Sequence, residues 1–441
     1  MSIMKKTLTT PRRPSGFNEY LPAQQIEFNR LLDIVRGTYE KYGYTPIDTP
    51  DLELSEVLLA KGGGETEQQI YRFTRGKNDL SLRFDLTVPL ARYTAEHEGE
   101  LVFPFRRYHI GKVHRAERAQ AGRFREFYQC DIDVIGSQSS VIDAEFPAVI
   151  NEIFDKFGFG EFTIRLNNRL VLNGFFEGIG LANVAAEVLR TIDKMDKITH
   201  EQLVAELKLV GLNDVQLAKV LDFTQITGTN DEVLNRLDAL AVNTDAYREG
   251  VTKLRELVAA LRAQKVPESR FQVDLRIARG LDYYTGTVYE TTLNDLPGVG
   301  SVCSGGRYDD LAQNYTSINL PGVGISIGLS RLFYKLLEAG AVNPTQQSLA
   351  RTIVMPLDDS ATQRGLEVAA QLRAWGIATI MYTEPGSMKK KFRYADRMGC
   401  RYAVVIGENE LTSGELTVKD MQSGESFTAP LEQLQQKLAQ E

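Results

Sequence analysis

The sequence predicts an α+β fold, with a core built on an antiparallel sheet, a helical insertion into that core, and an α/β domain at the C-terminal end. Strand patterns between residues 271 and 327 follow one another without the long helices that parallel crossovers require, which favours antiparallel pairing. Residues 169–267 are mainly helical in pattern, with apolar side chains at helical spacing and few Gly or Pro. From residue 350 onward, strand and helix patterns alternate, as in a compact α/β domain.

The length and the composition agree with this division. At 441 residues the chain has room for roughly three domains. We therefore expect a core in two parts, 1–168 and 268–340, separated by the insertion at 169–267 and followed by the α/β domain at 350–441. With 43% hydrophobic and 25% charged residues, the chain is not mainly disordered. No apolar run approaches the ~18 residues that a membrane span needs.

The three cysteines, Cys130, Cys303 and Cys400, lie far apart in the sequence and form no CxxC pair. This pattern predicts free thiols in a reducing cytoplasm, without a disulfide framework or a zinc site, and we assign no metal ligand to the protein itself. The first sixteen residues carry four cations but no apolar stretch, which argues against a secretory signal. Because they also lack acidic residues, a transit peptide remains an alternative.

Two basic clusters stand out in a chain whose formal net charge is −7. Residues 105–126 contain seven Lys or Arg against two Glu, and residues 387–401 contain six against one Asp. Each cluster alone is as compatible with a solvated surface as with a binding site for an anion.

Arg115 and Arg123 are the best candidates for phosphate contacts in the first cluster. They flank a short loop between two strand patterns, and a guanidinium binds phosphate oxygens bidentately. The more common role of such residues is a surface ion pair, here Arg115 with Glu117 or Arg125 with Glu126.

The strand pattern that follows this loop has one polar and one apolar face. Gln129, Asp131 and Asp133 alternate with apolar residues, so the three side chains share one face of the strand. A polar face of this kind either meets water or lines a site.

Arg279, Tyr283 and Tyr284 lie close together among small residues in the segment IARGLDYYTGTVYE. A guanidinium and a tyrosine hydroxyl at this spacing can face one cavity, although tyrosines at this density more often pack in a core or a hairpin. The glycine-rich segments VCSGGRYD and PGVGISIGLSRL would let the backbone approach a flat ligand closely, with Arg331 at a strand-to-helix transition. None of these segments matches a P-loop or a dinucleotide-binding fingerprint.

The order of these motifs in one chain resembles the class II aminoacyl-tRNA synthetases, and specifically the histidyl-tRNA synthetase family. RGLDYYTG beside REFYQCDID is the most specific part of the resemblance, which covers nearly the whole chain. The resemblance to the first class II motif covers residues 16–50, that to the second covers 113–136, and that to the third covers 322–332. The family's anticodon-binding domain is similar to residues 389–411 and their surroundings.

The resemblance implies a ligase that activates histidine with ATP to histidyl-adenylate and pyrophosphate, and then transfers the histidyl group to its tRNA. It implies ATP as a substrate with Mg²⁺, a homodimer formed through the first motif, and Arg115 and Arg279 as catalytic residues on opposite sides of the α-phosphate. Asp85, Thr87 and Gln129 would take the α-ammonium of histidine, and Asp133, Tyr284 and Tyr283 its imidazole. Arg115, Glu117, Arg123 and Arg331 would bind ATP, and Arg118, Gln120, Lys389, Lys390, Lys391 and Arg393 the tRNA.

One residue departs from the family pattern. Ser330 stands where the third motif commonly has an acid, which leaves open how Arg331 is held. Two other functions stay open as alternatives: a histidine-binding regulatory subunit, and an adenylate-forming ligase for another small molecule. Regulatory subunits of this kind typically lack the anticodon domain and the full set of arginines.

Overall fold

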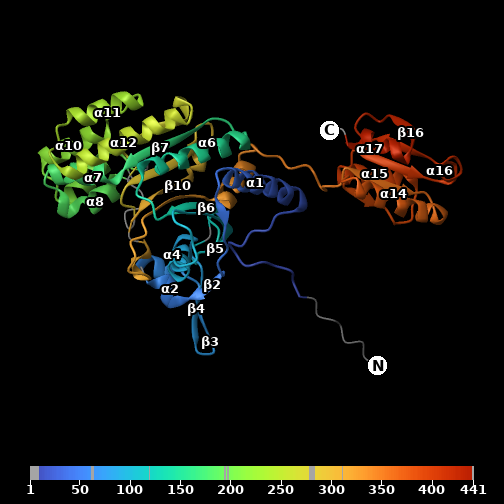
Figure 1. Cartoon of the computed structure of the whole chain (residues 1–441), viewed down its shortest axis with the longest axis horizontal. Helices are drawn as coiled ribbons and strands as arrows, with labels where there is room; N and C mark the ends of the chain where they lie inside the picture. The colour runs from blue at the N-terminus through green and yellow to red at the C-terminus, as the bar shows by residue number, and fades with distance from the viewer. Residues whose placement is uncertain are drawn as a thin grey trace. The chain divides into compact units, whose positions relative to one another are not determined.

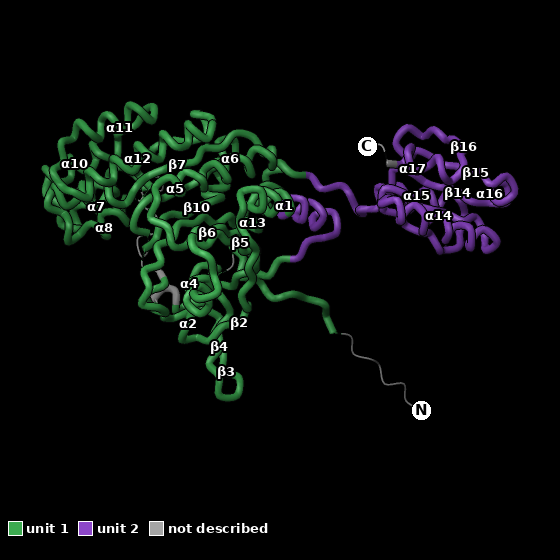
Figure 2. Tube along the Cα trace, in the orientation of Figure 1, with its two compact units in different colours: residues 1–18, 33–342 green, residues 19–32, 343–441 purple. Residues whose placement is uncertain are grey.

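The computed structural model describes residues 9–60, 64–118, 120–192, 195, 198–277, 284–309 and 311–439. The chain divides into two compact units, one of residues 1–18 and 33–342 and the other of residues 19–32 and 343–441 (Figure 2). Two of the predicted site residues, Arg279 and Tyr283, lie outside the described residues.

The first unit is built on a large mixed sheet (Figure 1). Its strands are β1 (Thr45–Pro46), β5 (Phe105–His114), β6 (Glu126–Ile135), β7 (Phe162–Asn168), β8 (Phe271–Val273), β9 (Thr287–Leu293), β10 (Ser301–Tyr308) and β11 (Gly322–Ile327). They lie in the order β1-β5-β6-β11-β10-β9-β7-β8. All neighbours from β5 to β7 pair antiparallel, while the short edge strands β1 and β8 pair parallel with β5 and β7. The predicted antiparallel core is therefore confirmed, and the parallel pairings are confined to its edges.

Helices and a small second sheet surround this core. The apolar face of β6 is fully buried at Cys130, Ile132 and Val134, and the Tyr39 hydroxyl donates to the carbonyl oxygen of Cys130 at 2.9 Å. The helices outside the insertion are α1 (Pro22–Lys41), α2 (Ser55–Leu59), α3 (Gly64–Gln69), α4 (Thr87–Glu96), α5 (Ser140–Asp143), α6 (Glu145–Phe157) and α13 (Leu329–Glu338), and the small sheet consists of β2 (Leu52–Leu54), β3 (Arg72–Arg75) and β4 (Asn78–Leu82).

The helical insertion leaves the large sheet after β7 and returns to it at β8. Because β7 and β8 are neighbours, with Ile164 opposite Phe271, the insertion begins and ends beside the same sheet edge. Gly174 and Gly250 allow the first and last helices of the insertion, α7 (Arg169–Gly178) and α12 (Asp245–Ala263), to pack closely, since a Cβ at Gly174 would lie 2.3 Å from the Tyr247 nitrogen. The insertion helices gather at one end of the unit (Figure 1): α7 (Arg169–Gly178), α8 (Ala185–Ile192), α9 (His200–Leu209), α10 (Asp214–Thr224), α11 (Asn230–Ala239) and α12 (Asp245–Ala263).

The second unit contains a five-stranded sheet in its residues 343–441. Its elements are β12 (Thr352–Pro356), α14 (Thr362–Ala374), β13 (Thr379–Met381), α15 (Met388–Met398), β14 (Tyr402–Ile406), α16 (Glu408–Ser413), β15 (Glu415–Asp420), β16 (Ser426–Pro430) and α17 (Leu431–Ala439). The order is β13-β12-β14-β15-β16, parallel among the first three strands and antiparallel beyond them. The predicted α/β character is confirmed, but β16 and α16 were not predicted, because both are short and mostly polar.

No helix within the described ranges is long and apolar enough to cross a lipid bilayer. All three cysteines are buried and free. Burial raises the pKa of the Cys400 thiol to about 11 and that of Cys130 and Cys303 further above the usual thiol range, so all three stay protonated at neutral pH.

Candidate functional site

The polar face of β6 continues across its two neighbouring strands. Gln129, Asp131 and Asp133 are all less than a tenth exposed, so this face is directed into the protein and not toward bulk water. Residues directly opposite one another in an antiparallel pair share a face of the sheet. The pairs in question are Gly111 with Gln129, His109 with Asp131 and Arg107 with Asp133 on β5, and Ser326 with Asp131 and Gly324 with Asp133 on β11.

Glycines keep this face of the sheet flat enough for side chains to lie across it. A Cβ at Gly324 would lie 2.0 Å from Asp133 Oδ1, and one at Gly306 would lie 2.9 Å from the Tyr284 ring. Any other residue at either position would displace these side chains. The glycines of β10 and β11 therefore leave room on this face for the side chains of Asp133 and Tyr284.

Asp133 is held by two partners that the sequence did not predict. The Tyr308 hydroxyl donates to Asp133 Oδ1 at 2.6 Å, and Arg107 Nη2 lies 2.5 Å from Asp133 Oδ2. Burial raises the pKa of the Asp133 carboxyl, and Arg107 and Tyr308 oppose that shift by stabilising the charged form. The carboxylate is thus fixed in position, and its oxygens retain lone pairs for a further donor.

Asp85 lies just before α4 and faces the same group of charges. Its Oδ1 accepts from the backbone nitrogens of Thr87 at 3.1 Å and Val88 at 2.9 Å. Burial raises the pKa of the Asp85 carboxyl, whereas the Val88 N–H and the Arg115 and Arg107 guanidinium groups lower it. Asp85 and Asp133 both raise the pKa of Asp131, and Asp85 also raises that of Asp133. Among the described residues around the buried Arg107, these carboxyl groups outnumber the guanidinium groups of Arg107 and Arg115, which suits a cationic ligand.

Gln129 contributes one donor and one acceptor to this face. Its Nε2 donates to Ser326 Oγ at 2.6 Å, while its Oε1 is buried and has no hydrogen-bond partner among the described residues. A buried carbonyl oxygen without a partner is an unusual feature in a folded protein and marks a place for a donor from a ligand.

Arg115 lies beside this face with its guanidinium over two aromatic rings. The guanidinium carbon is 4.3 Å from the Phe84 ring centroid and 5.1 Å from that of Phe127, and Nε donates to the Phe84 carbonyl oxygen at 3.3 Å. Rings on this planar group fix its orientation and leave its edge directed away from them. Such a fixed cation suits a carboxylate or a phosphate.

The loop after Arg115 has an ion pair that the sequence did not predict. Arg123 Nη1 lies 3.4 Å from Glu117 Oε2, and Arg125 Nε donates to the Glu117 carbonyl oxygen at 3.0 Å. Glu126 pairs with Lys112 at 2.7 Å and with His114, so the proposed alternative pair of Arg125 with Glu126 is not the one observed. Arg118 and Gln120 are exposed in the loop.

Ser330 has a structural partner. Its Oγ accepts from the Tyr128 backbone nitrogen at 2.9 Å, which ties the start of α13 to β6. Ser330 is buried, so a carboxylate at this position would not face solvent. Arg331 is exposed on the same helix and donates to the Val299 carbonyl oxygen at 3.4 Å.

The second basic cluster lies on α15 of the second unit and is not uniform. Lys389, Lys390 and Arg393 are exposed. Lys391 is only 4% exposed, and its ammonium donates to the carbonyl oxygens of Pro356 and Leu357, at 3.4 Å for the latter. The resemblance implied that all three lysines bind the tRNA, whereas the ammonium of Lys391 is directed to carbonyl oxygens of its own chain.

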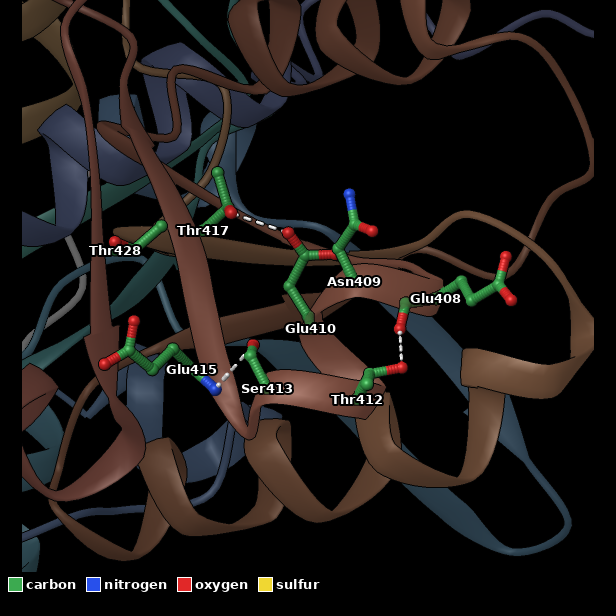
Figure 3. Close-up of a pocket in the computed structure, with 8 residues that line it drawn as sticks. All are labelled: Glu408, Asn409, Glu410, Thr412, Ser413, Glu415, Thr417 and Thr428. Atoms are coloured by element: carbon green, nitrogen blue, oxygen red, sulfur yellow. Dashed lines mark hydrogen bonds between the residues drawn. The ribbon is translucent and has the colours of Figure 1, made fainter.

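The second unit also has an open pocket lined by α16, β15 and β16 (Figure 3). Glu410 is central to it, but both carboxylate oxygens are engaged, by the Thr417 hydroxyl at 2.6 Å and the Gly407 nitrogen at 2.8 Å. No predicted site residue lies here. The lining residues are Glu408, Asn409, Glu410, Thr412, Ser413, Glu415, Thr417 and Thr428.

The fold of the first unit is that of a class II aminoacyl-tRNA synthetase. Residues 16–332 match the family model of histidyl-tRNA synthetase, and residues 352–441 match that of the anticodon-binding domain. The chain belongs to the histidyl-tRNA synthetase family.

Individual relatives agree along the whole chain. The histidine–tRNA ligase of Clostridium tetani is 52% identical over 98% of both chains, and that of Stenotrophomonas maltophilia is 48% identical over 95% of both. The crystal structure of histidyl-tRNA synthetase from Nostoc sp. PCC 7120 is similar with a TM-score of 0.92 and 41% identity, covering 98% of this chain and 99% of that one.

Proposed function

We infer that the chain is a histidine–tRNA ligase, which forms histidyl-adenylate and pyrophosphate from histidine and ATP and then transfers the histidyl group to the 3′ end of its tRNA. The buried face of β5, β6 and β11 carries this inference, because it sets several acidic groups beside the fixed guanidinium of Arg115. An amino acid presents the complementary charges, with an ammonium for the acidic groups and a carboxylate for the arginine.

For histidine, we propose that Asp85, Thr87 and Gln129 bind the α-ammonium. The Gln129 oxygen that has no partner in the described part of the chain supports this role. Asp133 would accept the imidazole N–H, since Arg107 and Tyr308 hold its carboxylate in place. The other edge of the ring would face Tyr284, with Tyr283 beside it.

For the activation step, we propose that Arg115 and Arg279 contact the α-phosphate while the histidine carboxylate attacks it. Fixed cations stabilise the more negative transition state more than the ground state, and this difference accelerates the step. Arg331 would hold the γ-phosphate, with Glu117 and Arg123 near the nucleotide.

Magnesium would accompany the ATP phosphates. Across the residues that the structure describes, no group of three or more His, Cys, Asp and Glu side chains is placed to hold a metal ion. Mg²⁺ bound with a nucleotide usually takes its ligands from phosphate oxygens, water and one or two carboxylates. Bound in this way, it would neutralise phosphate charge.

The decisive experiment is ATP–pyrophosphate exchange with each amino acid in turn. We expect exchange with histidine and background rates with the other amino acids, because the buried acceptors reject side chains that lack their donors. Histidine binding without exchange would indicate a regulatory binder, and exchange with another substrate would indicate a different ligase.

We propose that the loop around Arg118 and Gln120 contacts the acceptor end of the tRNA, and that Lys389, Lys390 and Arg393 contact its anticodon arm. Exposed cations on one helix suit phosphate contacts. Lys391 is left out of this group, because its charge is buried against carbonyl oxygens of its own chain.

The double substitution Lys389→Ala/Lys390→Ala is expected to raise the KM for tRNA by about 5- to 10-fold, and to lower the slope of affinity against salt by about one for each lysine. Pyrophosphate exchange should stay at the wild-type rate, since it needs no tRNA. An equal loss in exchange and in aminoacylation would contradict the assignment. Lys391→Ala is expected instead to destabilise the second unit, which thermal unfolding would detect.

We further propose that the chain works as a homodimer in the cytoplasm. The resemblance of residues 16–50 to the dimer-forming motif supports the dimer, and three buried free thiols fit a reducing compartment. We also propose the domain boundaries expected from the sequence: a core of 1–168 and 268–340, an insertion at 169–267 and a C-terminal domain at 350–441. Sedimentation velocity at micromolar concentration would test the assembly.

A further inference from the structure

Asp131 is the one carboxylate of the polar face of β6 that the proposed reaction does not use. It lies between Gln129 and Asp133 on that face and is only 2% exposed. Its Oδ1 has no hydrogen-bond partner within the described ranges. Burying such a group has a free-energy cost, so its presence calls for a role.

Ser326 on β11 connects Asp131 to Gln129. Ser326 lies directly opposite Asp131 in the pairing of β11 with β6, and its hydroxyl lowers the pKa of the Asp131 carboxyl, as a donor to the charged form does. The Ser326 oxygen accepts from Gln129 Nε2 at 2.6 Å. An ionised carboxylate can only accept, so the single hydroxyl hydrogen of Ser326 is directed to Asp131. The serine oxygen must then accept from Gln129, which fixes the amide with its nitrogen toward Ser326.

The remaining amide atom, Gln129 Oε1, is thereby left as an acceptor on the buried face. If the amide were turned over, it would present an N–H group in that place. An ammonium group has three donors and no acceptor, so it binds the first arrangement and is repelled by the second.

We propose that Asp131 is a positioning residue of the amino-acid site, which acts through Ser326 to hold the Gln129 amide with its oxygen toward the substrate ammonium. The inference rests on the proposed function, because it assigns the ammonium to Gln129. Asp131 itself does not touch the substrate.

Protonation of Asp131 reverses the order of donors. Burial raises the pKa of Asp131 to about 7, together with the charge of Asp133, while Arg107 and Ser326 lower it. A protonated Asp131 can donate to Ser326, whose hydrogen then favours the Gln129 oxygen and turns the amide. Histidine binding should therefore weaken as the pH falls through about 7.

The titratable or charged groups near Asp131 are Arg107 and His109 on β5, Asp133 and Cys130 on β6, Asp85 before α4, Tyr39 on α1 and Cys303 on β10.

The test compares four full-length proteins by calorimetric titration with histidine and by exchange kinetics: wild type, Asp131→Asn, Ser326→Ala and Ser326→Thr. Ser326→Ala should raise the Kd and KM for histidine about 10-fold or more, the range for a lost hydrogen bond to a charged group. Asp131→Asn should raise both constants too, because a side-chain amide can donate as well as accept and no longer fixes the direction of the Ser326 hydroxyl. The KM for ATP and kcat should change less than twofold. Ser326→Thr keeps the hydroxyl and should retain wild-type affinity, and the double variant Asp131→Asn/Ser326→Ala should be no worse than either single one.

The pH profile separates this role from a purely structural one. In the wild type, histidine binding should depend on the protonation of Asp131 and of the substrate imidazole, and Asp131→Asn should keep only the substrate's part. An unchanged Kd and profile in Asp131→Asn would overturn the inference, and so would parallel losses in both KM values, kcat and thermal stability. If Asp131→Asn does not fold, the pH profile of Ser326→Ala decides. Without the hydroxyl, titration of Asp131 no longer reaches Gln129, so a wild-type pH profile in Ser326→Ala would overturn the inference. Histidine binding without exchange in the wild type would refute the proposed function, while the Kd comparison still decides the role of Asp131.

Discussion

Arg115→Ala is expected to lower histidine-dependent pyrophosphate exchange by about 100- to 1,000-fold, the usual effect of removing one fixed donor that stabilises a developing charge. The Phe84 and Phe127 rings hold the guanidinium flat, so its orientation is set before the substrate binds. Arg115→Lys should lose most of the same activity, because an ammonium neither lies flat between the rings nor binds bidentately.

The matched control for this experiment is Arg248→Ala, which removes an arginine from an exposed ion pair with Asp245 on α12. It should leave exchange unchanged, since the pair lies on the surface of the insertion. Exchange by Arg115→Ala within a few-fold of this control would contradict the role of Arg115 in activation.

Asp143→Ala is expected to lower the free energy of unfolding of the first unit by about 3–5 kcal/mol, the range for removing one partner of a buried ion pair. Arg307 is buried and donates from Nε to both Asp143 oxygens, at 3.1 and 3.2 Å. The Thr287 hydroxyl also donates to Asp143 at 2.6 Å, so the change leaves a buried cation and a hydroxyl without their acceptor.

Two optical signals separate the units in urea unfolding. The single tryptophan, Trp375, belongs to the second unit, so its fluorescence reports that unit, whereas far-ultraviolet circular dichroism reports both. Asp143→Ala should shift the main circular dichroism transition and leave the fluorescence transition in place. The control Asp245→Ala removes an exposed carboxylate and should shift neither. A dichroism curve for Asp143→Ala that overlays this control would refute the prediction.

The polar face of β6 could be predicted from sequence because strand alternation is a local property. Its partners could not be predicted, because they come from other strands. Arg107 reaches Asp133 through the pairing of β5 with β6, and Tyr308 reaches it from β10, two strands away in the sheet and 175 positions away in the chain. Alternation within one strand shows which residues share a face, but it does not show which distant strands lie beside that strand.

Lys391 is a different case, because the signal was present in the sequence. It stands four residues before Ala395, and these two residues form the buried side of α15. Counting charges along the segment grouped Lys391 with its neighbours, whereas placing them around a helix would have separated it from Lys389 and Lys390.

The path of the chain into and out of the helical insertion bears on how such a protein can change over evolutionary time. Its two points of attachment, β7 and β8, are adjacent strands at one edge of the sheet. Helices can therefore be gained, lost or exchanged between them while β6, which carries Asp133, and β5, which leads to Arg115, keep their neighbours and their register. Variation in the insertion can thus leave the polar face of β6 unchanged, although the two segments belong to one continuous chain.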